Sequence, residues 1–298
     1  MKKSKLVMVG NGMAGVRTIE ELLKVAPDLY DITVFGAEPH PNYNRILLSP
    51  VLAGEQTLDE IVLNSWDWYT GNHITLHAGK KVVEVNRVRR IVRANDGTEV
   101  EYDRLLMCTG SNPFILPVPG KDLPGVIAYR DIADTNAMID ASIKYKRAVV
   151  IGGGLLGLEA ANGLMLRGMD VTVVHVMPTL MERQLDSVAG GLLQKSLEAR
   201  GLKFLMGAQT QELTGNDKGG KGGRVAAIKF KDGTELATDL VVMAVGIRPN
   251  TALAESMRLH CNKGIVVNDT MQTTTDARIY SVGECAAHRG IAYGLVAP

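Results

Sequence analysis

The sequence predicts an α/β protein of two three-layer domains, each with a β-meander, the second domain being inserted in the first. A strand, a glycine turn, a helix and a second strand follow one another at residues 5–38 and again at 147–176. Each unit is followed by alternating segments around a hairpin turn, NDGT at 95–98 and KDGT at 231–234. Two βαβ units in 298 residues indicate two domains with parallel sheets.

The order of the elements predicts the domain boundaries. Residues 116–246 carry the second βαβ unit and its hairpin, and we assign them to the second domain. Residues 264–290 are expected to form a short strand pair, a strand RIYSVG and the beginning of a helix, with too little apolar surface for a third domain. We therefore expect a discontinuous first domain of residues 1–115 and 247–298, with Pro298 inside its last helix segment.

The second hairpin contains a stretch rich in glycine and lysine at residues 218–223. Such a composition could hold a phosphate, but no strand-to-helix context surrounds it. We interpret it as a solvated loop tip.

The composition excludes several function classes. With 33 Lys and Arg against 32 Asp and Glu, the net charge of +1 does not favour nucleic acid or an anionic membrane. The apolar run at 240–247 is too short to cross a bilayer, so we expect a cytoplasmic enzyme. The three cysteines lie far apart, and His73 and His77 share a segment that alternates like a strand, so we expect neither a disulfide framework nor a metal site.

The first glycine turn has the pattern of a dinucleotide site. Gly10, Gly12 and Gly15 form Gly-x-Gly-x-x-Gly between a strand and a helix. One glycine permits the tight turn, one lets the backbone approach a pyrophosphate, and one lets helix and strand pack closely. The pyrophosphate then lies at the positive end of the helix. Glu38 ends the second strand, where a carboxylate binds a ribose; the alternative is an ordinary turn carboxylate.

The second glycine turn repeats the pattern with Gly152, Gly154 and Gly157. His175 stands where a ribose-binding carboxylate is expected. It could bind a ribose as neutral imidazole, tolerate a 2′-phosphate when protonated, or be a half-buried residue at a strand end. Arg183 could contact a phosphate if its loop folds back. Two dinucleotide sites in one chain indicate electron transfer between two cofactors.

Five motifs in one order make the resemblance specific. They are the first glycine turn, CTGSNP at 108–113, GGGLLGLEAA at 152–161, AVGIRPN at 244–250 and TTDARIYSVGE at 274–284. The chain resembles flavoproteins of the glutathione-reductase-like pyridine nucleotide superfamily over nearly its whole length. This resemblance implies two Rossmann-like domains, the first binding FAD and the second NAD(P)H.

The resemblance assigns cofactor-binding residues by position. For FAD they are Gly10, Gly12, Met13, Ala14, Gly15, Glu38, Arg45, Val83, Thr109, Gly110, Arg130, Gly283 and Glu284. For NAD(P)H they are Gly152, Gly154, Leu155, Gly157, Glu159, His175 and Gly246.

Besides Glu38 and His175, three of these assignments carry alternatives or departures. Glu284 stands where the family usually has aspartate, which keeps the acceptor but changes its reach. Glu159 matches a glutamate near the nicotinamide, or is an exposed helix carboxylate. Arg45 is a candidate for a pyrophosphate contact, or caps the helix region 46–54. No catalytic residue is expected, because hydride transfer needs the two rings stacked in near-attack geometry and no acid or base.

The cysteine pattern selects among family members. Disulfide reductases and thiol peroxidases need cysteine shortly after Glu38, and residues 39–60 contain none, so thiol chemistry is not expected. Ferredoxin and rubredoxin reductases often carry a lysine where this chain has Pro50. Cys285 would begin a helix aimed at the flavin; with no second cysteine nearby, we expect it to pack and not to do redox chemistry.

Three further stretches resemble the amino-terminal part of the large subunit of NADH-dependent, sirohaem nitrite reductases. They are AEPHPNYNRILLSPVLAGE, VMPTLMERQLD and VGECAAHRGIAYGLVAP. This resemblance implies hydride transfer from NAD(P)H, with NADH favoured, to FAD, and then to iron–sulfur and sirohaem centres on domains absent from this chain. Alternatives are a stand-alone ferredoxin or rubredoxin reductase and a nucleotide-binding redox sensor without useful turnover. A homo-oligomer stays open.

Overall fold

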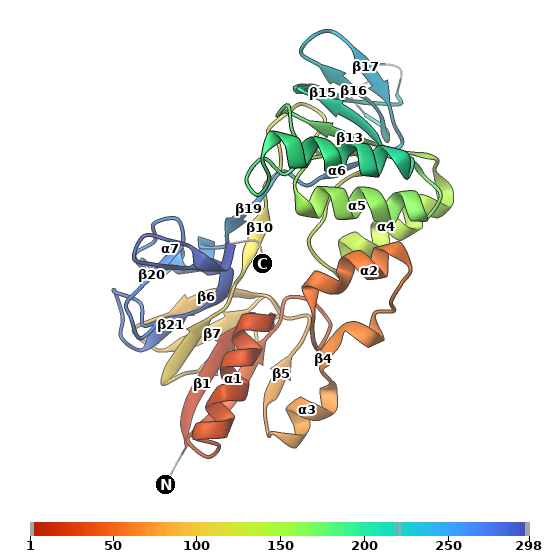
Figure 1. Cartoon of the computed structure of the whole chain (residues 1–298). Coiled ribbons are helices and arrows are strands. Elements are labelled where there is room, and N and C mark those ends of the chain that lie inside the picture. The colour runs from red at the N-terminus through yellow and green to blue at the C-terminus, as the bar shows by residue number, and fades with distance from the viewer. Residues whose placement is uncertain (1–2, 218, 220–221, 296–298) are drawn as a thin grey trace. The chain divides into compact units, whose positions relative to one another are not determined.

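The computed structural model describes residues 3–217, 219 and 222–295, and Figure 1 shows its helices and strands. Both halves of the chain are built on five-stranded parallel sheets, which confirms the predicted α/β fold. Within the described residues, no helix combines the length and the apolar character needed to cross a bilayer.

The chain divides into two compact units. Unit 1 comprises residues 1–44, 62–112 and 247–298; unit 2 comprises residues 45–61 and 113–246. Unit 2 is thus built from two segments that both lie between segments of unit 1 in the sequence.

The parallel sheet of unit 1 has the order β21-β9-β1-β2-β5. Its strands are β1 (Ser4–Val9), β2 (Tyr30–Phe35), β5 (Thr75–His77), β9 (Arg104–Met107) and β21 (Ile279–Ser281). Because side chains alternate along a strand, Leu6 and Met8 of β1 pack in one apolar cluster and Val7 and Val9 in another. The first cluster includes Ile19 of helix α1 (Met13–Val25), and the second includes residues of the meander. Unit 1 therefore has three layers.

The meander of unit 1 has the order β6-β7-β8 and is antiparallel. Its strands are β6 (Val82–Asn86), β7 (Ile91–Ala94) and β8 (Glu99–Glu101). Gly97 in the predicted NDGT turn has φ +86°, a left-handed conformation that glycine adopts without strain. The remaining elements of the unit are β3 (Asn42–Tyr43), β4 (Val62–Asn64), α3 (Trp66–Gly71), α7 (Ala252–Ser256), β20 (Ile265–Val267), η3 (Gly283–Cys285), β22 (Ala286–His288) and η4 (Tyr293–Leu295).

The prediction that a helix begins after Gly283 is wrong. The chain makes one 3-10 turn, η3, and then enters β22, which pairs in parallel with β20. Ile265 of β20 lies opposite Ala286 in this pair, and Cys285 is fully buried before it. The strand conformation of β22 depends on pairing with β20, about twenty residues earlier in the chain. Local sequence propensity cannot predict such a pairing.

The parallel sheet of unit 2 has the order β11-β18-β12-β13-β14. Its strands are β11 (Val126–Ala128), β12 (Arg147–Ile151), β13 (Asp170–His175), β14 (Lys203–Met206) and β18 (Leu240–Met243). The unit also contains helices α4 (Ile132–Lys144), α5 (Leu155–Leu166) and α6 (Ser187–Ala199) and the meander β15 (Thr210–Gly215), β16 (Val225–Phe230) and β17 (Glu235–Ala237). Val149 and Val241 of the sheet pack with Ile228 and Phe230 of the meander. The plan of unit 1 is thus repeated.

The hairpin loop predicted at residues 218–223 lies partly outside the described residues, which omit 218, 220 and 221. The strands on either side of it, β15 and β16, are antiparallel neighbours. Two further strands, β10 (Ser111–Pro113) and β19 (Ile247–Pro249), form a two-stranded sheet.

Residues 45–61 pack in unit 2, whereas the sequence assigns them to the first predicted domain. They form η1 (Arg45–Leu47), α2 (Leu48–Ala53) and η2 (Asp59–Ile61). Helix α2 lies against α5 at Gly163, where a side chain would meet Leu52 at 2.8 Å. The Arg167 guanidinium donates to the Val51 carbonyl at 3.1 Å and also to the Leu52 carbonyl. A helix that packs on α5 belongs to the same compact unit.

Candidate dinucleotide-binding sites

The loops predicted to bind FAD meet at one edge of the unit 1 sheet. Gly10 follows β1, Glu38 follows β2, Thr109 follows β9 and Gly283 follows β21. These strands are parallel, so their carboxyl ends lie at the same edge. In open α/β sheets, ligands bind at this edge.

The glycines of the first turn have three different roles. Gly10 has φ +106°, and a side chain there would overlap the Cys108 carbonyl. At Gly15 a side chain would meet the sulfur atoms of Met8 and Cys108 at 2.8 Å, so this glycine lets α1 pack on the sheet. Gly12 is the N-cap of α1 and faces open space, with nothing within 4 Å of a Cβ there.

The open space at Gly12 fits an anionic ligand. The N-cap makes no side-chain hydrogen bond, and the first turn of α1 contains no acidic residue. The first amides of a helix need acceptors, and the helix dipole favours negative charge there. Met13 and Ala14 supply the backbone that follows. This geometry fits a pyrophosphate, and its binding by the loop stays a prediction.

Glu38 is held by a tyrosine that the sequence analysis missed. The Tyr43 hydroxyl donates to Glu38 Oε2 at 2.7 Å, and Tyr43 is 6% exposed. A second buried tyrosine, Tyr69, donates to Asn11 Oδ1 at 2.6 Å inside the glycine turn, and burial raises its pKa to about 12. Both tyrosines are more than four residues from their partners, so no local pattern indicates these contacts.

Thr109, Gly110 and Glu284 lie at the same edge. Thr109 Oγ1 donates to the Asn250 carbonyl at 2.7 Å, and the Asn250 amide donates to the Gly110 carbonyl at 2.9 Å. The Ser111 hydroxyl donates to Glu284 Oε2 at 3.1 Å. These contacts join the segment after β9 to the segments 247–295 that complete unit 1.

Gly283 approaches the first helix. It has φ +80°, and a side chain there would meet the Ala14 Cβ at 2.9 Å. The next thiol, Cys285, is fully buried, with its sulfur 3.5 Å from the Met107 carbonyl. This environment supports the packing role expected for Cys285.

Val83 lies on β6, just after the chain leaves the edge that carries Glu38. The Gly79 amide donates to the Glu38 carbonyl and the Lys80 amide to the Gly36 carbonyl, both at 2.9 Å. The Val83 side chain is 50% exposed on the meander. A contact between Val83 and FAD stays a prediction.

The second glycine turn repeats the geometry of the first in unit 2. Gly152 has φ +127°, and a side chain there would overlap the Ala244 carbonyl. A side chain at Gly157 would overlap the Gly152 carbonyl, so α5 starts close against β12. Gly154 is the N-cap of α5 and faces open space, followed by Leu155. Gly246 follows β18 at the same edge, with φ +107°.

His175 is engaged at both ring nitrogens. Its Nδ1 accepts from the Gly153 amide at 3.1 Å, and its Nε2 lies 3.1 Å from Glu182 Oε2. The ring is 8% exposed. An Nδ1 that accepts a hydrogen bond carries no proton, so the proton belongs on Nε2 and points to Glu182. These contacts favour the half-buried alternative, in which His175 supports the glycine turn.

The loop that carries Arg183 folds back on the glycine turn. The Met181 amide donates to the Gly153 carbonyl at 3.0 Å. The loop therefore folds back, as a phosphate contact of Arg183 requires. The contact itself stays a prediction.

Glu159 ends a chain of hydroxyl groups within unit 2. Ser49 Oγ lies 2.7 Å from Glu159 Oε2 and 3.2 Å from the Tyr129 hydroxyl. Burial raises the pKa of Tyr129 to about 12, so this hydroxyl keeps its proton at neutral pH. Because an ionised carboxylate can only accept, Ser49 donates to Glu159 and Tyr129 donates to Ser49.

Ser49 and Tyr129 were not among the predicted site residues. They lie 110 and 30 residues before Glu159 in the chain. Tyr129 follows β11, at the same edge of the unit 2 sheet as Gly152 and Gly246. The hydroxyl chain therefore runs along the edge at which a nucleotide binds in such sheets.

Two predicted FAD contacts lie together in unit 2. Arg45 Nη1 donates to the Arg130 carbonyl at 2.6 Å. The Arg130 amide in turn donates to Asp134 Oδ2 at 2.7 Å, beside the start of α4. Contacts of either arginine with FAD stay predictions.

No three or more His, Cys, Asp or Glu side chains in the described part of the chain are placed to hold a metal ion. His77, one of the two histidines at i,i+4 spacing, stacks on Phe35 with ring centroids 4.8 Å apart.

Comparisons with known proteins agree with this geometry. A model of the pyridine nucleotide-disulphide oxidoreductase family matches residues 4–297. The chain is 58% identical over its whole length to a nitrite reductase (NAD(P)H) of Bacillus subtilis strain 168 and covers 36% of that protein. It is 50% identical over its whole length to the assimilatory nitrate reductase electron transfer subunit of the same strain and covers 38% of it.

A solved structure shares the fold. The covalent putidaredoxin reductase–putidaredoxin complex matches with a TM-score of 0.88 and 30% sequence identity, over 97% of this chain and 69% of that one. The two curated relatives are much longer, so the chain spans little more than a third of their length.

Proposed function

Because the chain belongs to the pyridine nucleotide-disulphide oxidoreductase family, we propose that it is a flavoprotein reductase module that takes hydride from NAD(P)H and passes electrons onward. One observation carries the proposal: two parallel sheets each present a glycine turn whose middle glycine caps a helix and faces open space. One turn suffices for a simple dehydrogenase, whereas two fit a pair of dinucleotides.

The residues present fit FAD in unit 1. The turn from Gly10 to Gly15 would hold its pyrophosphate, Glu38 its adenosine ribose, and Gly283 and Glu284 its ribityl end. FAD when bound accepts a hydride and releases electrons singly. The protein has to position the cofactor and exclude water. Tyr43 contributes to positioning, because its hydroxyl fixes one carboxylate oxygen of Glu38.

The residues of unit 2 support NADH as the donor. NADP carries a 2′-phosphate, which needs positive charge near the end of the second strand. His175 has no proton on Nδ1, and the Glu182 carboxylate beside Nε2 adds negative charge. This arrangement disfavours a 2′-phosphate and leaves NADH as the proposed donor, with Glu159 beside the nicotinamide.

We infer the acceptor from the relatives. A nitrite reductase and an electron transfer subunit align over the whole chain, and both continue well beyond the part it covers. We propose that electrons leave toward iron–sulfur and sirohaem centres on such additional domains, in the cytoplasm. A stand-alone reductase of a ferredoxin-like protein is the second candidate, favoured by the match to the putidaredoxin reductase complex.

The test is an assay with an artificial one-electron acceptor. The FAD-loaded chain is mixed with ferricyanide and either NADH or NADPH, and separately with nitrite. We expect ferricyanide reduction with NADH, at least about tenfold less with NADPH, and no nitrite consumption by this chain alone. Absence of ferricyanide reduction by protein that retains FAD would contradict the proposal.

A Ser49→Ala variant tests the hydroxyl chain. It removes the donor to Glu159 Oε2 and leaves Tyr129 without its acceptor. We expect kcat/KM for NADH to fall about 10- to 150-fold, which corresponds to the roughly 1.5 to 3 kcal/mol of a hydrogen bond to a charged group, while FAD content stays normal. Ser49→Thr keeps the hydroxyl and serves as the matched control. Equal kcat/KM values for wild type and Ser49→Ala would show that the hydroxyl groups of Tyr129 and Ser49 do not position Glu159.

A further inference from the structure

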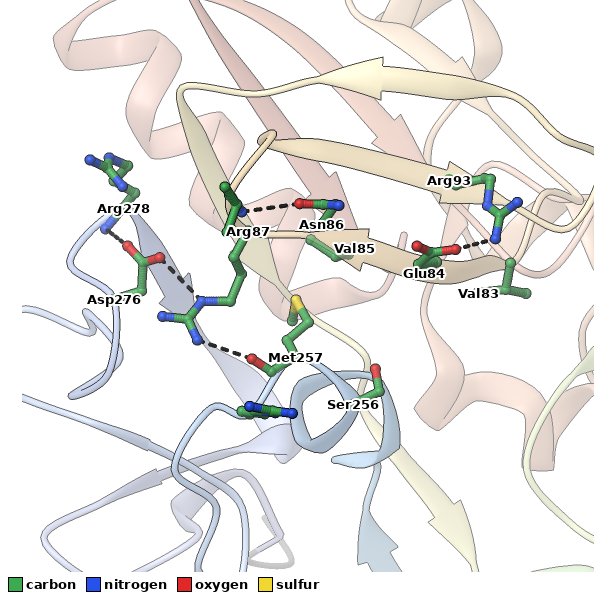
Figure 2. A pocket seen from close by; sticks show the side chains of 12 residues that line it. Val83, Glu84, Val85, Asn86, Arg87, Arg93, Ser256, Met257, Asp276 and Arg278 are labelled. Atoms are coloured by element: carbon green, nitrogen blue, oxygen red, sulfur yellow. Dashed lines mark hydrogen bonds and ion pairs between the residues drawn. The ribbon is translucent and has the colours of Figure 1, made fainter.

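Unit 1 carries a surface depression of about 910 Å³ away from the glycine turn (Figure 2). It is lined by residues 83–88 of β6 and the following turn, by Arg93, by residues 256–258 at the end of α7, and by Asp276 and Arg278. Asp276 and Arg278 precede β21, while Gly283 of the predicted FAD loop follows its carboxyl end. The main part of the depression therefore lies toward the opposite end of the sheet from the predicted FAD loops.

Positive charge predominates in this depression, which four arginines and two carboxylates line. Both carboxylates are already paired. Asp276 Oδ2 accepts from Arg87 Nε at 3.3 Å, and Glu84 forms an ion pair with Arg93, as Figure 2 shows. Arg87 is fixed further by donating to the Met257 carbonyl at 3.0 Å.

The other two arginines of the depression have no carboxylate partner among the described residues. Arg258 and Arg278 are exposed, and neither side chain has a hydrogen-bond or ion-pair partner among the described residues. Arg258 has φ +59°, a backbone conformation that is uncommon for a residue with a side chain. Two uncompensated positive charges on separate segments fit a ligand with several spaced negative charges.

The shape of the depression follows a strand with an open edge. β6 pairs only with β7 in the three-stranded sheet, so its other edge is unpaired among the described strands. Six consecutive residues from Val83 to Val88 line the depression, which therefore runs along β6 and the turn after it. Because side chains alternate between the two faces of a strand, a depression on one face alone would not include consecutive residues. Val83 and Val88 are 50% and 93% exposed and supply apolar surface.

We propose that this depression, which we call the arginine groove, binds an extended acidic segment of a partner polypeptide. The segment adds as a strand to the free edge of β6, and its carboxylates meet Arg258 and Arg278. Main-chain hydrogen bonds to an open edge provide affinity in such complexes, and side chains provide specificity. An extended peptide with carboxylates and apolar side chains matches both the charge and the valines, which a compact anion does not.

The test uses fluorescence anisotropy with the FAD-loaded chain. The probe is a fluorescein-labelled peptide of alternating glutamate and valine, about nine residues long as in an ordinary strand. We expect saturable binding that weakens with added salt, and at least about tenfold weaker binding to an Arg258→Gln/Arg278→Gln variant. A Lys195→Gln/Arg200→Gln variant removes the same charge from exposed positions on and after α6 and is expected to bind within about twofold of wild type.

Three controls separate the alternatives. A peptide of the same sequence with every main-chain amide N-methylated cannot donate the main-chain hydrogen bonds of a strand, and we expect it to bind at least about tenfold more weakly. Flavin reduction by NADH is expected to be the same in both double variants and wild type. Equal peptide affinity in the two double variants, or equal binding of the N-methylated peptide, would overturn the proposal. So would full displacement of the peptide by inorganic phosphate that supplies the same total negative charge as the peptide.

Discussion

A Gly12→Asp variant is expected to fold normally and to lose FAD. No atom lies within 4 Å of a Cβ at this position, and Gly12 is the N-cap of α1 with an extended backbone. Aspartate is a favoured N-cap residue, so the stability of the apoprotein should be unchanged or slightly raised. The same carboxylate would occupy the helix terminus that we assign to the pyrophosphate and would repel it. We expect FAD affinity to fall at least about 100-fold, which corresponds to roughly 2.7 kcal/mol.

Gly12→Asn is the matched control, because asparagine has the same size and caps a helix equally well without a charge. It should weaken FAD binding less than aspartate does. Fluorescence titration of apoprotein with FAD measures the affinity, and thermal unfolding measures the stability. If Gly12→Asp retained FAD as tightly as wild type, the assignment of this turn to a pyrophosphate would be wrong.

The corresponding change in unit 2, Gly154→Asp, is expected to leave FAD bound and to abolish NADH use. Gly154 also caps a helix and faces open space. A carboxylate there would repel the pyrophosphate of NADH by the same mechanism. We expect kcat/KM for NADH to fall at least about 100-fold, while the flavin absorbance of the purified protein stays normal.

Paired with Gly12→Asp, this variant separates the two sites. Gly154→Asn again controls for size, and photochemical or dithionite reduction shows whether the flavin of the variant is intact. Loss of FAD in Gly154→Asp, or normal turnover with NADH, would contradict the assignment of one dinucleotide to each unit.

Much of the fold could be predicted from the sequence because its signals are local. Each βαβ unit repeats an apolar strand, a glycine turn and an amphipathic helix within about thirty residues, and each hairpin has its own turn sequence. The glycine roles also follow from local geometry: the positions predicted for a tight turn, open approach and close packing have these environments in the structure.

The misses depend on contacts between distant segments. Helix α2 joins unit 2 because it packs on α5 at Gly163, more than a hundred residues later. The strand β22 forms because β20 is beside it, where a helix was expected. Hydroxyl groups select their partners only after the fold is complete, so neither Tyr43 beside Glu38 nor Ser49 beside Glu159 could be found from spacing.

The stretch PNYNRILLSP at residues 41–50 shows both outcomes. Its lack of cysteine is evident from the sequence and indicates that electrons leave by a route other than a thiol. Its division between the two units could not be predicted from the sequence. Residues 42–43 form β3 in unit 1, and residues 45–50 belong to unit 2, where Arg45 and Ser49 contact Arg130 and Glu159.

The proposed function requires that this chain transfers hydride from NADH to its own FAD. Anaerobic stopped-flow mixing of the FAD-loaded chain with NADH tests it most directly, by following the absorbance of the oxidised flavin without any acceptor present. We expect this absorbance to bleach within seconds, and we expect NADH deuterated at the transferred position to slow the bleaching. A flavin that stays oxidised, in protein shown to hold both FAD and NADH, would contradict it.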